Sequence, residues 1–106
     1  MSFPDLYEDV LQANLREWTE KQFPTRNLHS ILAHLHKEIA ELEQKPDDMY
    51  EFADCFMLLF DAASFQNKRM SDIFIAIEQK LEINKKRKWG EPNSEGFTEH
   101  IREKDD

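Results

Sequence analysis

Glycine is scarce in this sequence, and its scarcity excludes several familiar ways of binding phosphate. Only two of the 106 residues are glycine, Gly90 and Gly96, and both lie near the C-terminus. P-loops and dinucleotide-binding turns need glycines where the backbone approaches a phosphate, so neither is present. Folds with many tight turns between strands are disfavoured for the same reason. If the protein binds phosphates, side chains or metal ions must hold them.

Cysteine, long apolar runs and basic charge are also in short supply. The single Cys55 cannot form a disulfide within the chain, which is typical of reducing compartments. The longest apolar run, residues 55–60, is far too short to span a bilayer, and no signal peptide is recognisable. Fourteen Lys and Arg stand against 22 Asp and Glu, a formal net charge of −8, which disfavours contact with nucleic-acid phosphates. We therefore expect a soluble cytoplasmic protein that binds neither nucleic acid nor membranes.

The apolar residues recur with a helical period, and prolines or polar breaks separate four helical segments. We expect helices over residues 2–23, 27–45, 48–66 and 71–88, with Asn27, Asp48 and Ser71 near the starts of the last three. Residues 93–106 are predicted to be a polar, turn-like tail. The simplest arrangement is one all-α domain over residues 1–106, built as a four-helix bundle.

The third predicted helix is apolar on nearly all sides, which indicates a central place in the core or burial between subunits. We therefore expect a homo-oligomer, either a dimer or a tetramer, that completes the bundle. Two aromatic residues near the end of the first helix are ambiguous. Trp18 and Phe23 are able to stack on a nucleobase, but we expect Trp18 in the core.

Two acidic pairs flank the break between the second and third helices. Glu38 and Glu41 lie in the last turns of one helix, and Glu51 and Asp54 in the first turns of the next. A spacing of three puts each pair on one helical face, and a short connection makes the helices antiparallel neighbours. The hairpin then brings four carboxylates together, which is unfavourable without a cation. An all-oxygen cluster suits Mg²⁺ or Mn²⁺, although most acidic runs are simply solvated surface.

A basic strip closes the fourth predicted helix. Lys80, Asn84 and Arg87 share one face, and asparagine is a poor helix former inside a helix. A cation, an amide and a guanidinium in line are able to clamp a polyphosphate in place of the missing glycine loop. Trp89 follows the strip and is a candidate for substrate contact. His34 lies one turn before Glu38 on the same face and is a further candidate.

Together these motifs resemble the MazG-like all-α nucleoside triphosphate pyrophosphohydrolases. The resemblance rests on the ExxE…ExxD pairs and the segment KxxxNxxRxW at residues 80–89. Residues 34–38 (HLHKE), 51–55 (EFADC), 61–63 (DAA) and 80–84 (KLEIN) are similar to the small dATP/dGTP pyrophosphohydrolase branch. The likeness covers residues 28–101, and the nine residues between the acidic pairs are fewer than is usual in the family.

The resemblance implies Mg²⁺-dependent cleavage of (d)NTP between the α and β phosphates, with a preference for dATP and dGTP and with Mn²⁺ as a possible substitute. It implies that the four acids are the metal ligands, and that Lys80 and Asn84 bind the substrate. Either Glu38 or Glu41 would orient the attacking water. A non-enzymatic acidic helical adaptor or regulatory protein is the alternative, and it predicts that Mg²⁺ affects neither thermal stability nor nucleotide binding.

Overall fold

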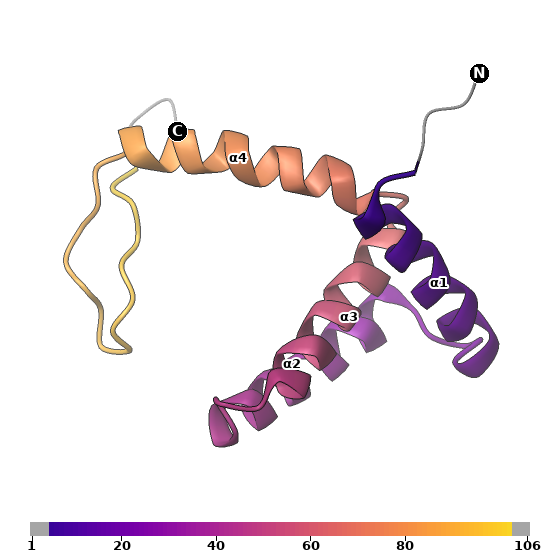
Figure 1. The fold of residues 1–106 in the computed structure, drawn as a ribbon. Coiled ribbons are helices and arrows are strands. Elements are labelled where there is room, and N and C mark those ends of the chain that lie inside the picture. The colour runs from indigo at the N-terminus through magenta and orange to yellow at the C-terminus, as the bar shows by residue number, and fades with distance from the viewer. Residues whose placement is uncertain (1–4, 103–106) are drawn as a thin grey trace. The chain divides into compact units, whose positions relative to one another are not determined.

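Four α-helices make up most of the chain (Figure 1). The structure is a computed structural model that describes residues 5–102, so the predicted helix start at Ser2 and Pro4 lies outside the described residues. The helices are α1 (Tyr7–Gln22), α2 (Leu28–Gln44), α3 (Met49–Phe65) and α4 (Met70–Lys86). The all-α prediction is confirmed. None of these helices is long and apolar enough to cross a membrane within the described residues.

Local capping signals set the starts of α2 and α3. The side-chain oxygen of Asn27 accepts a hydrogen bond from Ser30 N at 2.8 Å, and Ser30 Oγ accepts one from Asn27 N at 2.9 Å. This reciprocal pair is a capping box. Asp48 caps α3 by accepting from Tyr50 N at 2.9 Å. Both boundaries lie where the sequence predicts them, because the capping side chain lies next to the helix that it caps.

The predicted cap of the fourth helix is wrong. Helix α4 begins at Met70, so Ser71 lies inside its first turn. Asp9 in α1 takes the capping role instead: its carboxylate accepts from Ser71 N at 2.9 Å and from Ser71 Oγ at 2.6 Å. These hydrogen bonds lower the pKa of Asp9 below its usual 3.8. The capping group comes from 62 residues away, where local sequence signals cannot reveal it.

The chain forms two compact units, Met1–Ile73 and Phe74–Asp106. In the first unit, α3 packs against both α1 and α2. A small apolar core lies at the end of α3, where Leu15 and Ile73 pack against Phe60, Ala63 and Met70. This unit alone contains the acidic residues of α2 and α3.

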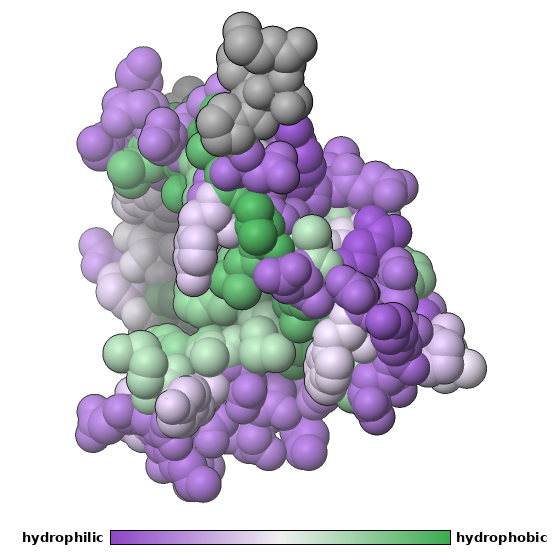
Figure 2. Space-filling view, turned by 45° about the vertical axis from the view of Figure 1, so that its right-hand side comes forward, coloured by the Kyte–Doolittle hydropathy of each residue, from purple (hydrophilic) through white to green (hydrophobic). Residues whose placement is uncertain are grey.

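Several large apolar side chains of α1 and α3 remain exposed, and Figure 2 shows apolar residues gathered at the surface. Phe56 and Met57 on α3 expose 56% and 42% of their surface. The expectation that Trp18 belongs to the core is also wrong, because it is 51% exposed. Its ring packs edge-to-face against Phe23, with centroids 5.4 Å apart, at the wall of a cavity rather than between packed helices.

The second unit combines the rest of α4 with a hairpin-like tail. Gly90 N donates to Glu99 O at 3.1 Å, and an isolated antiparallel bridge joins the neighbouring residues Trp89 and His100. The reversal lies at residues 93–97, where Gly96 has a φ of 92°, a conformation that suits glycine. The predicted turn-like tail is therefore an ordered reversal over its described part.

Candidate active site

A tight turn between α2 and α3 positions the acidic residues. Lys45 N donates to Glu41 O at 3.0 Å, and Asp48 N donates to Lys45 O at 3.1 Å, so the chain reverses within a few residues of the end of α2. Pro46 lies in this turn and prevents α2 from continuing. The two helices then pack along each other, which places the last turns of α2 beside the first turns of α3.

Three glutamates converge at this end of the hairpin. One carboxylate oxygen from each of Glu38, Glu41 and Glu51 lies within 4.8 Å of the other two. Glu38 is only 8% exposed. The Oε2 atoms of Glu38 and Glu51 are shielded from solvent and have no hydrogen-bond partner within residues 5–102. Buried carboxylate oxygens without donors are unfavourable, and a hard divalent cation would satisfy them. The three glutamates, which we call the acidic trio, therefore fit a metal ion.

The crowding of negative charge is reflected in the pKa of Glu38. The close approach of the Glu41 carboxyl group, burial, and the charges of Glu41 and Asp54 all raise the pKa of Glu38 above its usual 4.5. The hydrogen bond between His34 Nε2 and Glu38 Oε1, at 3.0 Å, acts in the opposite direction. In the absence of a cation, a proton relieves part of the repulsion. A metal ion at this place would compete with that proton.

Asp54 stands beside the acidic trio rather than within it. Its charge acts on Glu38, and both residues line the same cavity. Asp54 is also less than one turn along α3 from Glu51. The structure thus brings all four predicted carboxylates to one end of the hairpin, with three of them close enough to share an ion.

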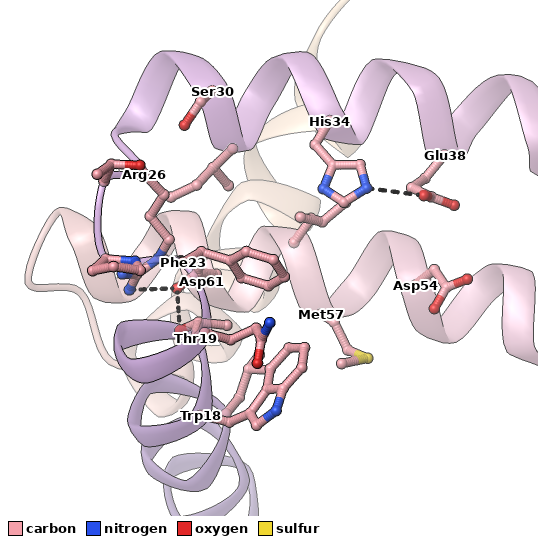
Figure 3. A pocket seen from close by; sticks show the side chains of 16 residues that line it. Trp18, Thr19, Phe23, Arg26, Ser30, His34, Glu38, Asp54, Met57 and Asp61 are labelled. Atoms are coloured by element: carbon pink, nitrogen blue, oxygen red, sulfur yellow. Dashed lines mark hydrogen bonds and ion pairs between the residues drawn. The ribbon is translucent and has the colours of Figure 1, made fainter.

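A cavity of about 550 Å³ opens next to the trio in the first unit (Figure 3). Glu38 and Asp54 lie at one end of it, and Arg26 and Asp61 lie at the other. Trp18, Phe23 and Met57 line the space between these ends. With a divalent cation held by the acids, a cavity with an apolar, partly aromatic middle suits a molecule whose anionic end binds the cation and whose flat part lies along the middle.

Cys55 lies beside the acids but has the properties of a structural residue. Burial raises the pKa of its thiol, and the charges of Glu38, Asp54 and Glu51 raise it further. A protonated thiol is a poor nucleophile. Cys55 therefore serves as a small buried side chain of α3.

The second unit holds the other predicted substrate residues. Arg87 Nη1 donates to Asn84 Oδ1 at 3.3 Å, and Trp89 Nε1 donates to Asn84 O at 3.0 Å. The Trp89 ring also packs edge-to-face against His100, with centroids 5.9 Å apart. Lys80 is exposed and lies one turn before Asn84 on α4. Asn84, Arg87 and Trp89 thus form one cluster at the end of α4.

A family model for dATP/dGTP pyrophosphohydrolases matches residues 11–106. The chain belongs to this family. Two phage proteins named dATP/dGTP diphosphohydrolase are similar to it, and each matches 86% of this chain. One, from Salmonella phage PMBT28, is 33% identical over 92 residues; the other, from cyanophage S-2L, is 33% identical over 93 residues. The matched region makes up 30% of the Salmonella phage protein and 85% of the cyanophage protein.

A solved structure supports the same family. The cyanophage S-2L MazG-like pyrophosphohydrolase, bound to dGDP and three catalytic Mn²⁺ ions per active site, superposes with a TM-score of 0.75 at 32% identity. The match covers 92% of this chain and 100% of that chain. The predicted resemblance to MazG-like pyrophosphohydrolases is confirmed, and by its family the chain is a hydrolase of acid anhydrides.

The polar group at the far end of the cavity is not predictable from the spacing of residues in the sequence. Arg26 and Asp61 form a buried ion pair although they are 35 residues apart in the chain. Thr19 joins them from α1 through a hydrogen bond to Asp61. A spacing between residues in the sequence cannot predict contacts among three residues that lie on three different segments. The only available signal was Asp61 itself, an acid deep within the otherwise apolar second half of α3.

Proposed function

We propose that this protein hydrolyses dATP and dGTP to the nucleoside monophosphate and pyrophosphate in a reaction that requires Mg²⁺, with Mn²⁺ as a substitute. The observation that carries the proposal is the convergence of three buried or half-buried glutamates beside a cavity of nucleoside size. The names of the phage relatives, and the dGDP and Mn²⁺ in the cyanophage structure, support the same substrate and a divalent ion.

The acidic trio and Asp54 would hold the metal. When bound, divalent ions neutralise phosphate charge and make a water molecule more acidic, so that it attacks phosphorus near neutral pH. Either Glu38 or Glu41 would orient that water and accept its proton. Attack by the water breaks the bridge between the α and β phosphates, and pyrophosphate leaves. His34 would hold Glu38 in place through the hydrogen bond at 3.0 Å and contact the substrate from the cavity wall.

The remaining predicted residues would bind the two ends of the nucleotide. The aromatic faces of Trp18 and Phe23 would contact the nucleoside in the cavity. Lys80, Asn84 and Arg87 would supply positive charge and donors to the phosphates, with Trp89 beside them. Because the family match runs from residue 11 to residue 106, we treat residues 1–106 as one functional domain.

We further propose that the protein is a homo-oligomer. An apolar groove of about 430 Å³ runs between α1 and α3, where Leu11, Trp18, Phe56 and Met57 are exposed. A second copy of the chain would cover this groove and, through Trp18 and Met57, part of the wall of the nucleotide cavity. Light scattering at micromolar concentration tests the idea. A monomer at that concentration would contradict the proposed oligomer.

The reaction itself is tested by one panel of assays. The purified protein is given each common NTP and dNTP with Mg²⁺, with Mn²⁺ or with EDTA, and the products are separated by chromatography. We expect pyrophosphate and the monophosphate only when a divalent ion is present, and fastest from dATP and dGTP. Release of inorganic phosphate and a diphosphate would contradict the proposed bond. No product from any nucleotide, with Mg²⁺ leaving the melting temperature unchanged, would favour an acidic adaptor instead.

A further inference from the structure

A rigid cation lies at the end of the cavity remote from the acidic trio (Figure 3). Arg26 Nε donates to Asp61 Oδ2 at 2.9 Å, and Arg26 Nη2 donates to Asp61 Oδ1 at 3.0 Å. Thr19 Oγ1 donates to the same Oδ1 at 3.1 Å. The Arg26 and Asp61 side chains are 11% and 4% exposed, and the guanidinium carbon lies 5.6 Å from the centroid of the Phe65 ring. These contacts hold the guanidinium in one orientation.

The second edge of this guanidinium makes no hydrogen bond within residues 5–102, and Arg26 lines the cavity. A guanidinium carries five N–H donors, and Asp61 takes one from Nε and one from Nη2. Nη1 of Arg26 has no hydrogen-bond partner in the part of the chain that the structure describes. The edge formed by Nη1 and Nη2 therefore keeps its donors, and both oxygens of Asp61 are already engaged. A flat group with two adjacent acceptors matches that edge.

The spacing of the residues at the two ends of the cavity suits a nucleoside between the acidic trio and Arg26. Asp54 and Asp61 line its two ends and are seven residues apart on α3, which is a rise of about 10 Å along the helix. That rise is comparable to the reach of a purine nucleoside from its 5′ carbon to the outer edge of the base. With its phosphates at the trio, a nucleotide would present its base edge to Arg26 and its base faces to Trp18 and Met57.

We propose that Arg26, held by Asp61 and Thr19, reads the O6 and N7 edge of guanine and makes the protein prefer dGTP to dATP. Guanine presents two adjacent acceptors on this edge, and they match the arginine fork. Adenine presents N7 beside the N6 amino group, so one donor of Arg26 would face another donor and stay unpaired. This inference rests on the proposed function, because it takes the phosphate end of the cavity to be at the acidic trio.

Base analogues test the inference on the wild-type protein. Equilibrium binding of dGMP, dIMP, 7-deaza-dGMP and dAMP is measured by calorimetry in the presence of Mg²⁺. Inosine keeps O6 and N7 and lacks only the 2-amino group, whereas 7-deazaguanine lacks the N7 acceptor. We expect dGMP and dIMP to bind equally, about tenfold tighter than dAMP, with 7-deaza-dGMP between them. Equal binding of dGMP and dAMP, or dIMP as weak as dAMP, would overturn the inference.

A conservative variant localises the effect. Arg26→Lys keeps a cation beside Asp61 but removes the planar fork. We expect it to lower the preference for dGMP over dAMP to nearly one while leaving dAMP binding within about twofold of wild type. Arg16→Lys is the matched control, since Arg16 is half-exposed, pairs with Glu20 and does not line the cavity. A folded Arg26→Lys variant that keeps the guanine preference would overturn the inference.

The two proposals fail in different ways. If pyrophosphate is released but Arg26→Lys keeps the ratio of dGTP to dATP turnover, only the base-reading role is wrong. If no nucleotide is hydrolysed, the proposed reaction is wrong, and the binding of dGMP against dAMP still decides the role of Arg26.

Discussion

Glu38 has the most constrained surroundings of the four acids. Its Oε1 contacts His34 at 3.0 Å, and its Oε2 is buried without a partner among the described residues. The neighbouring carboxylates raise its pKa above 4.5. Because the folded metal-free protein holds this proton more tightly than the unfolded chain, the contribution of Glu38 to stability is fully present below pH 4.5 and is lost as pH rises through the raised pKa.

We therefore expect Glu38→Gln to stabilise the metal-free protein while abolishing turnover. The neutral amide removes the repulsion from Glu41 and can keep the contact with His34. Thermal unfolding in EDTA at pH 8 should show a melting temperature about 4–8 °C higher, which corresponds to about 1 kcal/mol in a domain of this size. At pH 4 the difference should shrink, because wild-type Glu38 is then protonated.

Glu43→Gln is the control for this experiment, because Glu43 is exposed on the same helix and lies outside the acidic trio. It should leave both the melting temperature and turnover close to wild type. A Glu38→Gln variant that is less stable than wild type in EDTA at pH 8 would contradict the proposed charge crowding.

The convergence of the acids was predictable from the sequence, and the position of Arg26 was not. The spacing of three within each acidic pair and a turn at Pro46 were sufficient to bring Glu38, Glu41 and Glu51 together, because helix geometry converts spacing into position. The Arg26–Asp61 pair depends on the tertiary packing of separate segments. In the sequence, Arg26 and Asp61 are two charged residues with no spacing that would indicate a contact.

At the scale of helices, α2 and α3 follow the sequence because their starts are capped by adjacent side chains. Asn27 and Asp48 both precede their helices directly. The start of α4 instead depends on Asp9, which belongs to α1. Asp9 therefore stabilises the first turn of α4 only when α1 is packed beside it. Helix propensity along the chain could not reveal the residue at which α4 begins.

Asp9→Ala should reveal this coupling. It removes the acceptors for Ser71 N and Ser71 Oγ, so we expect a loss of about 1 kcal/mol in the free energy of unfolding, the usual effect of a lost helix cap. Chemical denaturation at pH 7 measures it. Because the pKa of Asp9 is lowered, the contribution is present above pH 3.8 and disappears as pH falls through the lowered pKa.

Asp5→Ala is the matched control for Asp9→Ala, since Asp5 is exposed and precedes α1. It should change the free energy of unfolding by less than about 0.5 kcal/mol. If the two variants unfold alike at pH 7, the capping role of Asp9 is wrong.

For the whole molecule, the sequence predicted the all-α fold class but not which apolar side chains are exposed. The helical period and the scarcity of glycine led to an all-α fold, which is confirmed. Burial was harder to predict. Trp18 and much of the apolar surface of α3 are exposed, because periodicity reports which face of a helix is apolar and not what covers it. Periodicity likewise does not show whether a second copy covers this surface, so the homo-oligomer remains a prediction.

The acidic trio is the proposed metal site, and the binding of Mn²⁺ to the metal-free protein tests that assignment directly. Metal-free protein is titrated with Mn²⁺, and the free ion is followed by its electron paramagnetic resonance signal. Wild type and Glu43→Gln should bind Mn²⁺ equally, whereas Glu51→Gln, which removes one of the three converging carboxylates, should bind at least about tenfold more weakly. If Glu51→Gln binds Mn²⁺ as tightly as wild type, the acidic trio is not the metal site.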